Sequence, residues 1–188
     1  MNTSSFKKMV SAFVVIVCIV PYFAAASSSH CAPNEIYIVR HVEKLIIAGE
    51  RDPDLSPLGY QHARALDEKL KTIKFDRVMA TQYKRTQLTV KPIAKRNLKK
   101  LAIYNAADVN SLATSLLHAC QQNIIVAGHS NTVPELLKAL GLKFKVTING
   151  QNLNHEAEVY LNEKDDYDSL FKVNFSDRGK AEVTLLRF

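Results

Sequence analysis

Short apolar runs rich in β-branched residues alternate along the chain with longer segments in which apolar residues recur at helical spacing. The short runs are typical of strands and the longer segments of helices. The predicted strands cover residues 34–40, 75–80, 101–104 and 123–127. Because strands and helices alternate, the pattern predicts right-handed crossovers and an α/β fold. The expected architecture is a three-layer sandwich whose mostly parallel central sheet is flanked by helices on both faces.

The segments between these runs are predicted to be helical. They begin near residues 57, 84, 109 and 135, and their apolar patterns end near residues 73, 96, 120 and 140. Ser56 is a typical N-cap for the first helix because Pro57 follows it at the first helical position. Asn131 or Thr132 is expected to cap the fourth helix, and Gly141 to end it.

The C-terminal third departs from this alternation. Residues 169–175 and 181–188 alternate apolar and polar positions around a turn at residues 176–179, which predicts a closing C-terminal β-hairpin. Residues 146–160 resist assignment. Asn149, Gly150, Asn152 and Asn154 indicate a loop, and a strand is expected around residues 159–161.

Residues 1–26 have the character of a secretory signal peptide. Lys7 and Lys8 precede an apolar run, and Pro21 and small alanines follow it, as they do before a signal-cleavage site. We therefore predict a signal peptide at residues 1–26, one domain at residues 27–188, and a periplasmic or secreted protein without stable membrane insertion. The alternative is an uncleaved N-terminal membrane anchor, because residues 9–26 are mostly apolar.

Composition and charge narrow the function. The chain has 188 residues with 47% apolar and 23% charged residues, which suits one globular domain and excludes collagen-like, coiled-coil and disordered chains. Loss of the signal would leave 23 basic and 18 acidic residues, a formal charge of +5. The chain has no RNA-binding aromatic motif and no Cys/His finger, which disfavours nucleic acid as a partner. A small anionic substrate is sufficient to explain a mild basic excess.

Candidate chemistry lies where the predicted strands end, because ligands of open α/β sheets bind beyond the carboxyl ends of the strands. The first strand leads into Arg40 and His41, the second leads toward Arg85, and the fourth leads into His129. If these strands are neighbours, two histidines and two arginines meet at one edge of the sheet.

This set of residues suits phosphoryl transfer. The guanidinium groups of Arg40 and Arg85 can hold phosphoryl oxygens bidentately. His41 fits an imidazole that attacks phosphorus through one nitrogen while a backbone hydrogen bond fixes the other, and His129 fits a donor to the equatorial oxygens. The nearby arginines disfavour the imidazolium form of the nucleophile. Transfer then depends on positioning and charge stabilisation, so no metal or other cofactor is expected.

Three motifs in chain order carry a family resemblance. RHVE after the first strand, KRTQLT at the start of the second helix and GHS after the fourth strand resemble the histidine phosphatase, or phosphoglycerate-mutase-like, superfamily. The resemblance covers about residues 34–188. It implies that His41 is the phosphohistidine nucleophile and that Arg40, Arg85 and His129 complete the phosphate pocket. Asn131, just after the GHS motif, is a candidate substrate-binding residue.

The chain departs from the family pattern at the proton donor. Many members place a glutamate in the loop after the third strand, but residues 104–108 contain none. Ser130 stands where the acid-phosphatase branch has an aspartate. Asp108, Glu43 and Glu135 are the remaining candidates for protonating the leaving group. Small family members without a clear acid suit good leaving groups such as phosphohistidine or phosphoanhydrides.

Two other kinds of site are disfavoured. Four further histidines show no ligand spacing, so we expect surface or structural roles for His30, His62, His118 and His155, and no metal site. The GHS motif could be taken for a nucleophile elbow with Ser130 attacking, but Thr132 stands where that motif needs glycine. A serine hydrolase is therefore a poor fit.

The two cysteines beyond the predicted signal peptide have matching offsets. Cys31 lies ten residues before His41, and Cys120 lies nine residues before His129. If the histidines meet at the carboxyl ends of adjacent parallel strands, the cysteines meet near the opposite ends. We therefore predict a Cys31–Cys120 disulfide, worth about 4 kcal/mol on the chain-entropy model. The alternative is two buried free thiols.

The sequence therefore predicts a metal-independent phosphatase that hydrolyses a phosphomonoester or related phosphoryl group through phospho-His41. Its expected partner is a small phosphorylated anion. A non-catalytic phosphate-binding module of the same fold is the alternative, and a phosphomutase is less favoured. Retention of all four pocket residues favours catalysis, whereas the missing glutamate favours binding alone or a narrow choice of substrate.

Overall fold

The computed structural model describes residues 31–148, 151–154, 161–162, 166–176 and 181–188. Six strands form the main sheet in the order β3-β2-β4-β1-β7-β8. Their bounds are β1 Glu35–Arg40, β2 Arg77–Thr81, β3 Leu101–Tyr104, β4 Asn123–Gly128, β7 Ser169–Phe175 and β8 Ala181–Arg187. β1 to β4 pair in parallel, and β7 and β8 add an antiparallel edge beside β1. The predicted α/β class with its mostly parallel sheet is confirmed.

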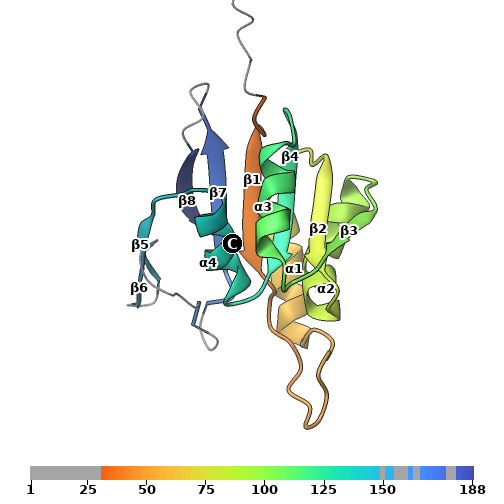
Figure 1. The fold of residues 1–188 in the computed structure, drawn as a ribbon. Coiled ribbons are helices and arrows are strands. Elements are labelled where there is room, and N and C mark those ends of the chain that lie inside the picture. Colours follow the sequence, from red (N-terminus) through yellow and green to blue (C-terminus); the bar gives the residue numbers. More distant parts are fainter. Residues whose placement is uncertain (1–30, 149–150, 155–160, 163–165, 177–180) are drawn as a thin grey trace, which may run out of the picture.

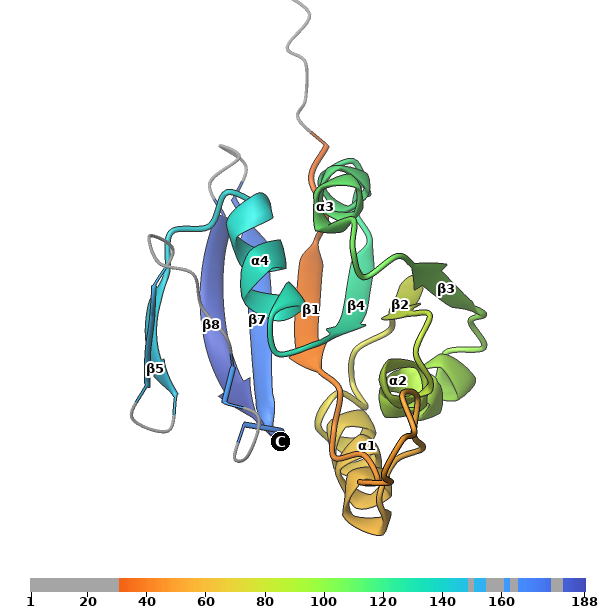
Figure 2. The same ribbon diagram turned by 60° about the horizontal axis from the view of Figure 1, so that its bottom comes forward.

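Helices cover both faces of this sheet (Figures 1 and 2). Their bounds are α1 Pro57–Lys69, α2 Lys84–Arg96, α3 Val109–Leu117 and α4 Thr132–Ala139. Successive residues of a strand face opposite sides, so β1 contributes to two cores. Ile36 and Ile38 pack with residues of α3 and α4, whereas Tyr37 and Val39 pack with residues of α1 and α2.

The helix ends follow local capping chemistry. The Ser56 side chain accepts a hydrogen bond from the Gly59 N–H at 3.0 Å, as predicted for the N-cap of α1. α1 ends at Lys69, and the apolar pattern continues to Ile73 only through a turn. α4 begins at Thr132, so Asn131, one of the two predicted caps, takes the N-cap position, although its side chain makes no capping hydrogen bond. The chain leaves α4 through Gly141 at a φ of 75°, a conformation that favours glycine.

A disulfide ties the start of the described chain to the end of α3. Cys31 and Cys120 are joined, with their Cα atoms 4.9 Å apart, which confirms the predicted pairing. α3 ends at Leu117 rather than at the predicted Cys120, because the chain turns there toward the segment that precedes β1. In this turn the Gln121 N–H donates to the carbonyl oxygen of Ala32 at 2.8 Å.

The C-terminal third confirms one expectation and corrects another. β7 and β8 pair antiparallel from Ser169↔Arg187 to Phe175↔Ala181, as predicted for a hairpin, and its turn lies outside the described residues. The predicted loop was wrong at Asn152 and Asn154, because β5 (Lys145–Ile148) and β6 (Gln151–Asn154) form a separate antiparallel pair. Polar residues can form β6 because pairing with β5 supplies hydrogen-bond partners for its backbone N–H and C=O groups.

Several expectations fall outside the described residues. These are the signal peptide, the assignments of Asn149 and Gly150, and the strand expected around residues 159–161 apart from Leu161, which lies in no strand. In the part of the chain that the structure describes, no helix is both long and apolar enough to cross a membrane.

Candidate active site

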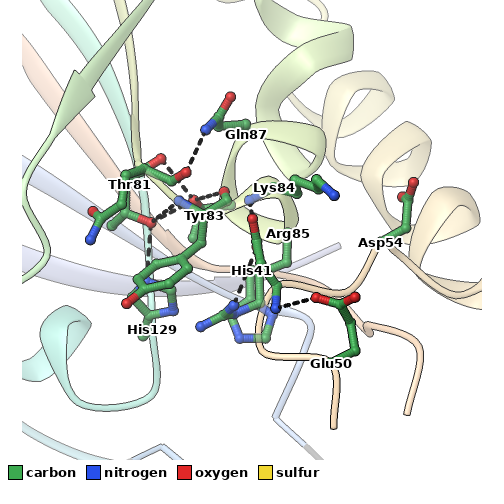
Figure 3. Close-up of polar contacts among 12 residues, drawn as sticks. His41, Glu50, Asp54, Thr81, Tyr83, Lys84, Arg85, Gln87 and His129 are labelled. Atoms are coloured by element: carbon green, nitrogen blue, oxygen red, sulfur yellow. Dashed lines mark hydrogen bonds and ion pairs between the residues drawn. The ribbon is translucent and has the colours of Figure 1, made fainter. Parts of the chain in front are cut away.

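Strand register brings the predicted residues together. β1 and β4 pair in parallel with Arg40 opposite Gly128, so the residues that follow each strand emerge side by side. The His41 N–H donates to the Gly128 carbonyl oxygen at 2.9 Å, which continues this pairing into the site. The ring centroids of His41 and His129 lie 5.5 Å apart. Figure 3 shows these rings close to the side chains of Arg85 and Tyr83.

A cavity of about 920 Å³ opens at this end of the sheet. Six of the residues named from the sequence line it, namely Arg40, His41, Glu43, Arg85, His129 and Asn131. The volume lies at the upper end of ligand pockets, so the cavity has room for a phosphoryl group and a sizeable leaving group.

His41 is held in one tautomer. Its Nδ1 lies 2.8 Å from the carbonyl oxygen of Val42, and since a carbonyl can only accept, Nδ1 carries the proton and Nε2 carries the lone pair. Only 5% of the residue is exposed. Burial lowers the pKa of His41 to about 3, and the charges of Arg40, His129 and Arg85 act in the same direction.

The backbone beneath His41 is fixed by the second motif. The Val42 N–H donates to Thr89 Oγ1 at 3.1 Å, and the Thr89 hydroxyl donates to the Arg85 carbonyl oxygen at 2.7 Å. Thr89 therefore links the loop after β1 to the first turns of α2. Because Arg85 lies on that helix, the same contact sets the position of a guanidinium relative to the His41 ring.

His129 is anchored from two sides. Its backbone N–H donates to Thr132 Oγ1 at 2.8 Å, and its Nε2 lies 3.1 Å from the hydroxyl of Thr81 at the end of β2. Burial is the main reason that the pKa of His129 is lowered to about 4, and the charges of Arg85 and Arg40 act in the same direction. The free site therefore holds two neutral imidazoles beside two guanidinium groups at neutral pH.

The two arginines are supported in different ways. Arg40 is 3% exposed and donates through one terminal nitrogen to the carbonyl oxygens of Asn162 at 2.7 Å and Asp166 at 3.3 Å. Arg85 lies 3.7 Å from the carboxylate of Asp52, which also accepts from the backbone N–H of Lys84 at 2.9 Å.

Two tyrosines complete the site, and sequence reasoning missed both. The Arg40 guanidinium lies 4.2 Å from the ring centroid of Tyr167, and that of Arg85 lies 4.4 Å from the ring centroid of Tyr83. Tyr167 also faces His41, and Tyr83 packs edge-on against His129. Tyr83 could have been noticed two positions before Arg85, whereas Tyr167 lies outside the three motifs.

The positions of the three candidate proton donors distinguish them. Glu43 lines the cavity, whereas Asp108 caps α3 by accepting from the Ser111 N–H at 3.1 Å. Hydrogen bonds from the Ser111 side chain and N–H lower the pKa of Asp108. Glu135 lies away from the cavity and lines a separate hollow beside α4. Glu43 pairs with His62 at 2.9 Å, so this histidine contacts a residue of the site.

The cavity lining is rich in hydrogen-bonding groups rather than in metal ligands. Among the described residues, no group of three or more His, Cys, Asp and Glu side chains is arranged to hold a metal ion. Ser130 lines the cavity together with Asn131 and Thr132, directly after the GHS motif.

Comparison with known proteins supports the sequence resemblance. The model of the histidine phosphatase superfamily (branch 1) matches residues 36–108, a range that holds the first two motifs. No curated protein matches the chain.

Solved structures share the fold at low sequence identity. The glucosyl-3-phosphoglycerate phosphatase of a mycobacterium aligns with a TM-score of 0.56 at 12% identity, over 82% of this chain and 98% of that one. The α-ribazole phosphatase of Shigella flexneri aligns with a TM-score of 0.55 at 13% identity, over 82% and 96%. The protein histidine phosphatase SixA, solved with tungstate, aligns with a TM-score of 0.53 at 13% identity, over 81% and 96%. The predicted phosphoglycerate-mutase-like fold is thereby confirmed.

Proposed function

We propose that this chain, a histidine phosphatase superfamily protein by the match of its residues 36–108, hydrolyses a phosphomonoester or related phosphoryl group through a phosphohistidine at His41. The observation that carries the proposal is the fixed, neutral His41 ring. Its Nδ1–H is committed to the Val42 carbonyl oxygen, and its depressed pKa leaves Nε2 unprotonated beside two guanidinium groups.

The geometry supports a two-step reaction. Arg40 and Arg85 bind the phosphoryl oxygens, and His129 stabilises the charge that develops on them. A bond forms from His41 Nε2 to phosphorus as the bond from phosphorus to the leaving oxygen breaks. Water then attacks the phosphohistidine, the phosphorus–nitrogen bond breaks, and inorganic phosphate leaves with His41 restored.

Glu43 is our proposed proton donor to the leaving group. It lines the cavity, unlike Asp108 and Glu135, and the contact with His62 holds its carboxyl group in one orientation. The Glu43→Gln variant should lose rate on alkyl phosphates, whose leaving groups need a proton. It should lose little on p-nitrophenyl phosphate, whose leaving group departs as a stable anion. Equal losses on both substrates would contradict this role.

Export is part of the proposal. The disulfide between Cys31 and Cys120 is compatible with an oxidising compartment, and residues 1–26 have the pattern of a cleaved signal. We expect a periplasmic or secreted domain of residues 27–188. The mass of the protein recovered from the periplasmic fraction of an expressing bacterium tests this, because an uncleaved anchor would retain the full mass in the membrane fraction.

The activity test compares two histidine variants. Phosphate release from p-nitrophenyl phosphate is measured in EDTA for residues 27–188, for His41→Ala and for His118→Ala, whose ring is exposed and bonded to Thr114. We expect turnover in EDTA, its loss in His41→Ala and no change in His118→Ala. Activity that survives His41→Ala, or that EDTA abolishes, would overturn the proposed mechanism.

A phosphate-binding module is the second candidate function, and one observation favours it. None of residues 104–108 is a glutamate, and Asp108 within that segment caps a helix. Such a module would bind inorganic phosphate but release none from any ester. A mutase would instead transfer the phosphoryl group to an added alcohol, which is measured in the same assay by recovering the phosphorylated acceptor.

A further inference from the structure

A residue near the C-terminus forms ion pairs with the segment that carries Tyr167. Arg187, near the C-terminus, contacts the carboxylates of both Asp166 and Asp168, the two neighbours of Tyr167. The contact with Asp166 measures 3.4 Å. Arg187 therefore holds the backbone on both sides of the ring that stacks on Arg40.

Strand register explains why a C-terminal residue reaches the site. Val39 lies opposite Leu170 on β7, and Ser169, one position earlier on β7, lies opposite Arg187 on β8. Since β7 runs antiparallel to β1, Arg40 and Arg187 lie at the same level of the sheet. Figure 2 shows that β8 ends at the end of the sheet where the chain leaves β1.

Asp166 connects this level to the pocket. Its carbonyl oxygen accepts from Arg40 at 3.3 Å, while its side chain contacts the Ser169 hydroxyl and Arg187. Asp166 has no exposed surface, and burial raises its pKa, whereas the charge of Arg187 acts in the opposite direction. A buried carboxylate needs such a partner, because water cannot solvate it.

We propose that Arg187 is a positioning residue of the phosphate pocket, which holds Tyr167 and Arg40 in place by bridging Asp166 and Asp168. Without the bridge, the buried Asp166 side chain must take up a proton or move toward solvent. Either change shifts the carbonyl group that accepts from Arg40 and the ring that covers its guanidinium. The Arg40 guanidinium would then be less well aligned to bind a phosphate, and the affinity of the pocket for phosphate would fall.

This inference rests on the pocket being a phosphate site, so its test measures phosphate binding as well as turnover. Arg187→Met keeps the length of the side chain and removes its charge, and Arg187→Lys keeps the charge. Arg96→Met is the matched control, because Arg96 also pairs with an aspartate, Asp67 at 2.7 Å, between α1 and α2. Calorimetric titration with inorganic phosphate, kcat and KM, and the melting temperature are recorded for each.

We expect Arg187→Met to raise the Kd of inorganic phosphate and the KM by about tenfold, by analogy with the loss found when a residue that orients a metal ligand is removed. Its kcat should change less, and Arg187→Lys should recover most of the affinity. Arg96→Met should leave the phosphate Kd unchanged. Unaltered phosphate affinity in a folded Arg187→Met protein, or an equal loss in Arg96→Met, would overturn the inference.

A second variant keeps the test decisive if Arg187→Met does not fold. Tyr167→Leu removes the ring but leaves the contacts of Arg187 in place, and it should weaken phosphate binding to a similar extent. Asp168→Asn breaks only the half-exposed side of the bridge and should give a smaller loss. If Tyr167→Leu and Asp168→Asn both bind phosphate normally, the inference fails. If the unaltered protein binds no phosphate and releases none, the proposed function fails with it.

Discussion

The two buried histidines predict that the free protein loses stability in mild acid. His41 and His129 are neutral in the folded protein because burial lowers their pKa values to about 3 and about 4. In the unfolded chain the histidine pKa is about 6.5. The unfolded state therefore binds more protons below that pH, and stability decreases as pH falls from about 6.5 toward the folded pKa values.

The size of the effect follows from the same values. At pH 5 the unfolded histidine lies about 1.5 pH units below its pKa, while the folded His41 remains almost fully neutral. At 1.36 kcal/mol per unit, each ring costs about 2 kcal/mol of folding free energy at pH 5 relative to pH 8. His41 and His129 together therefore cost about 4 kcal/mol, a large part of the stability of an ordinary domain.

Urea denaturation at pH 8 and pH 5 measures this cost. His41→Asn is the chosen variant because the amide nitrogen of asparagine can still donate to the Val42 carbonyl oxygen, while the group does not titrate. The loss of unfolding free energy between the two pH values should be about 2 kcal/mol smaller in His41→Asn than in the unaltered protein. His118→Ala, which removes an exposed ring away from the site, is the matched control.

Comparing pH differences within each protein removes the direct effect of the substitution on stability. The reasoning is refuted if the unaltered protein and His41→Asn lose the same free energy between pH 8 and pH 5. That result would mean that the His41 ring has an ordinary pKa when folded. A depressed pKa could then no longer account for an unprotonated, nucleophilic Nε2.

Three further changes have definite expected outcomes. Replacing Cys31 and Cys120 by serine removes a cross-link with a sequence separation of 89, which stabilises the fold by about 4 to 5 kcal/mol. The Tm should therefore fall by roughly 10 °C, and a reductant should have little effect on the Tm of the variant. Gly59→Ala places a Cβ 2.0 Å from the Glu43 carbonyl oxygen and should cost about 1–3 kcal/mol in urea denaturation; an unchanged midpoint would contradict the close approach. Asp52→Ala removes the acceptor for the first N–H of α2 and should cost about 1 kcal/mol, measured in the same way.

The central sheet was predictable from the sequence because its strands are buried on both faces. β1 and β4 are continuous apolar runs whose bounds fell within one residue of expectation. The pair formed by β5 and β6 could not be predicted in this way. β6 has a single apolar residue, Leu153, among polar ones, so its strand conformation comes from pairing with β5, which no local pattern reports.

The residues of the candidate site also divide into those that the sequence could predict and those that it could not. The meeting of Arg40, His41, Arg85 and His129 could be predicted because each lies at the end of a strand, directly after a strand or at the start of the next helix, where parallel topology brings them to one edge. Tyr167 follows no such rule. It reaches Arg40 across more than a hundred residues of chain, and its place depends on the antiparallel register of the last two strands.

The charge balance of the cavity connects stability to the proposed function. Its lining includes the basic residues Arg40, Lys44 and Arg85 against one acidic residue, Glu43. Tyrosine rings cover the two guanidinium groups, which limits their solvation and strengthens their field on nearby groups. The arginine charges, which add to the effect of burial in lowering the histidine pKa values, also favour a phosphate dianion, so a bound phosphoryl group relieves a repulsion that the free fold carries. Phosphate should therefore raise the melting temperature of the protein, and Arg85→Met should reduce that rise, because binding to the folded state alone stabilises it by mass action.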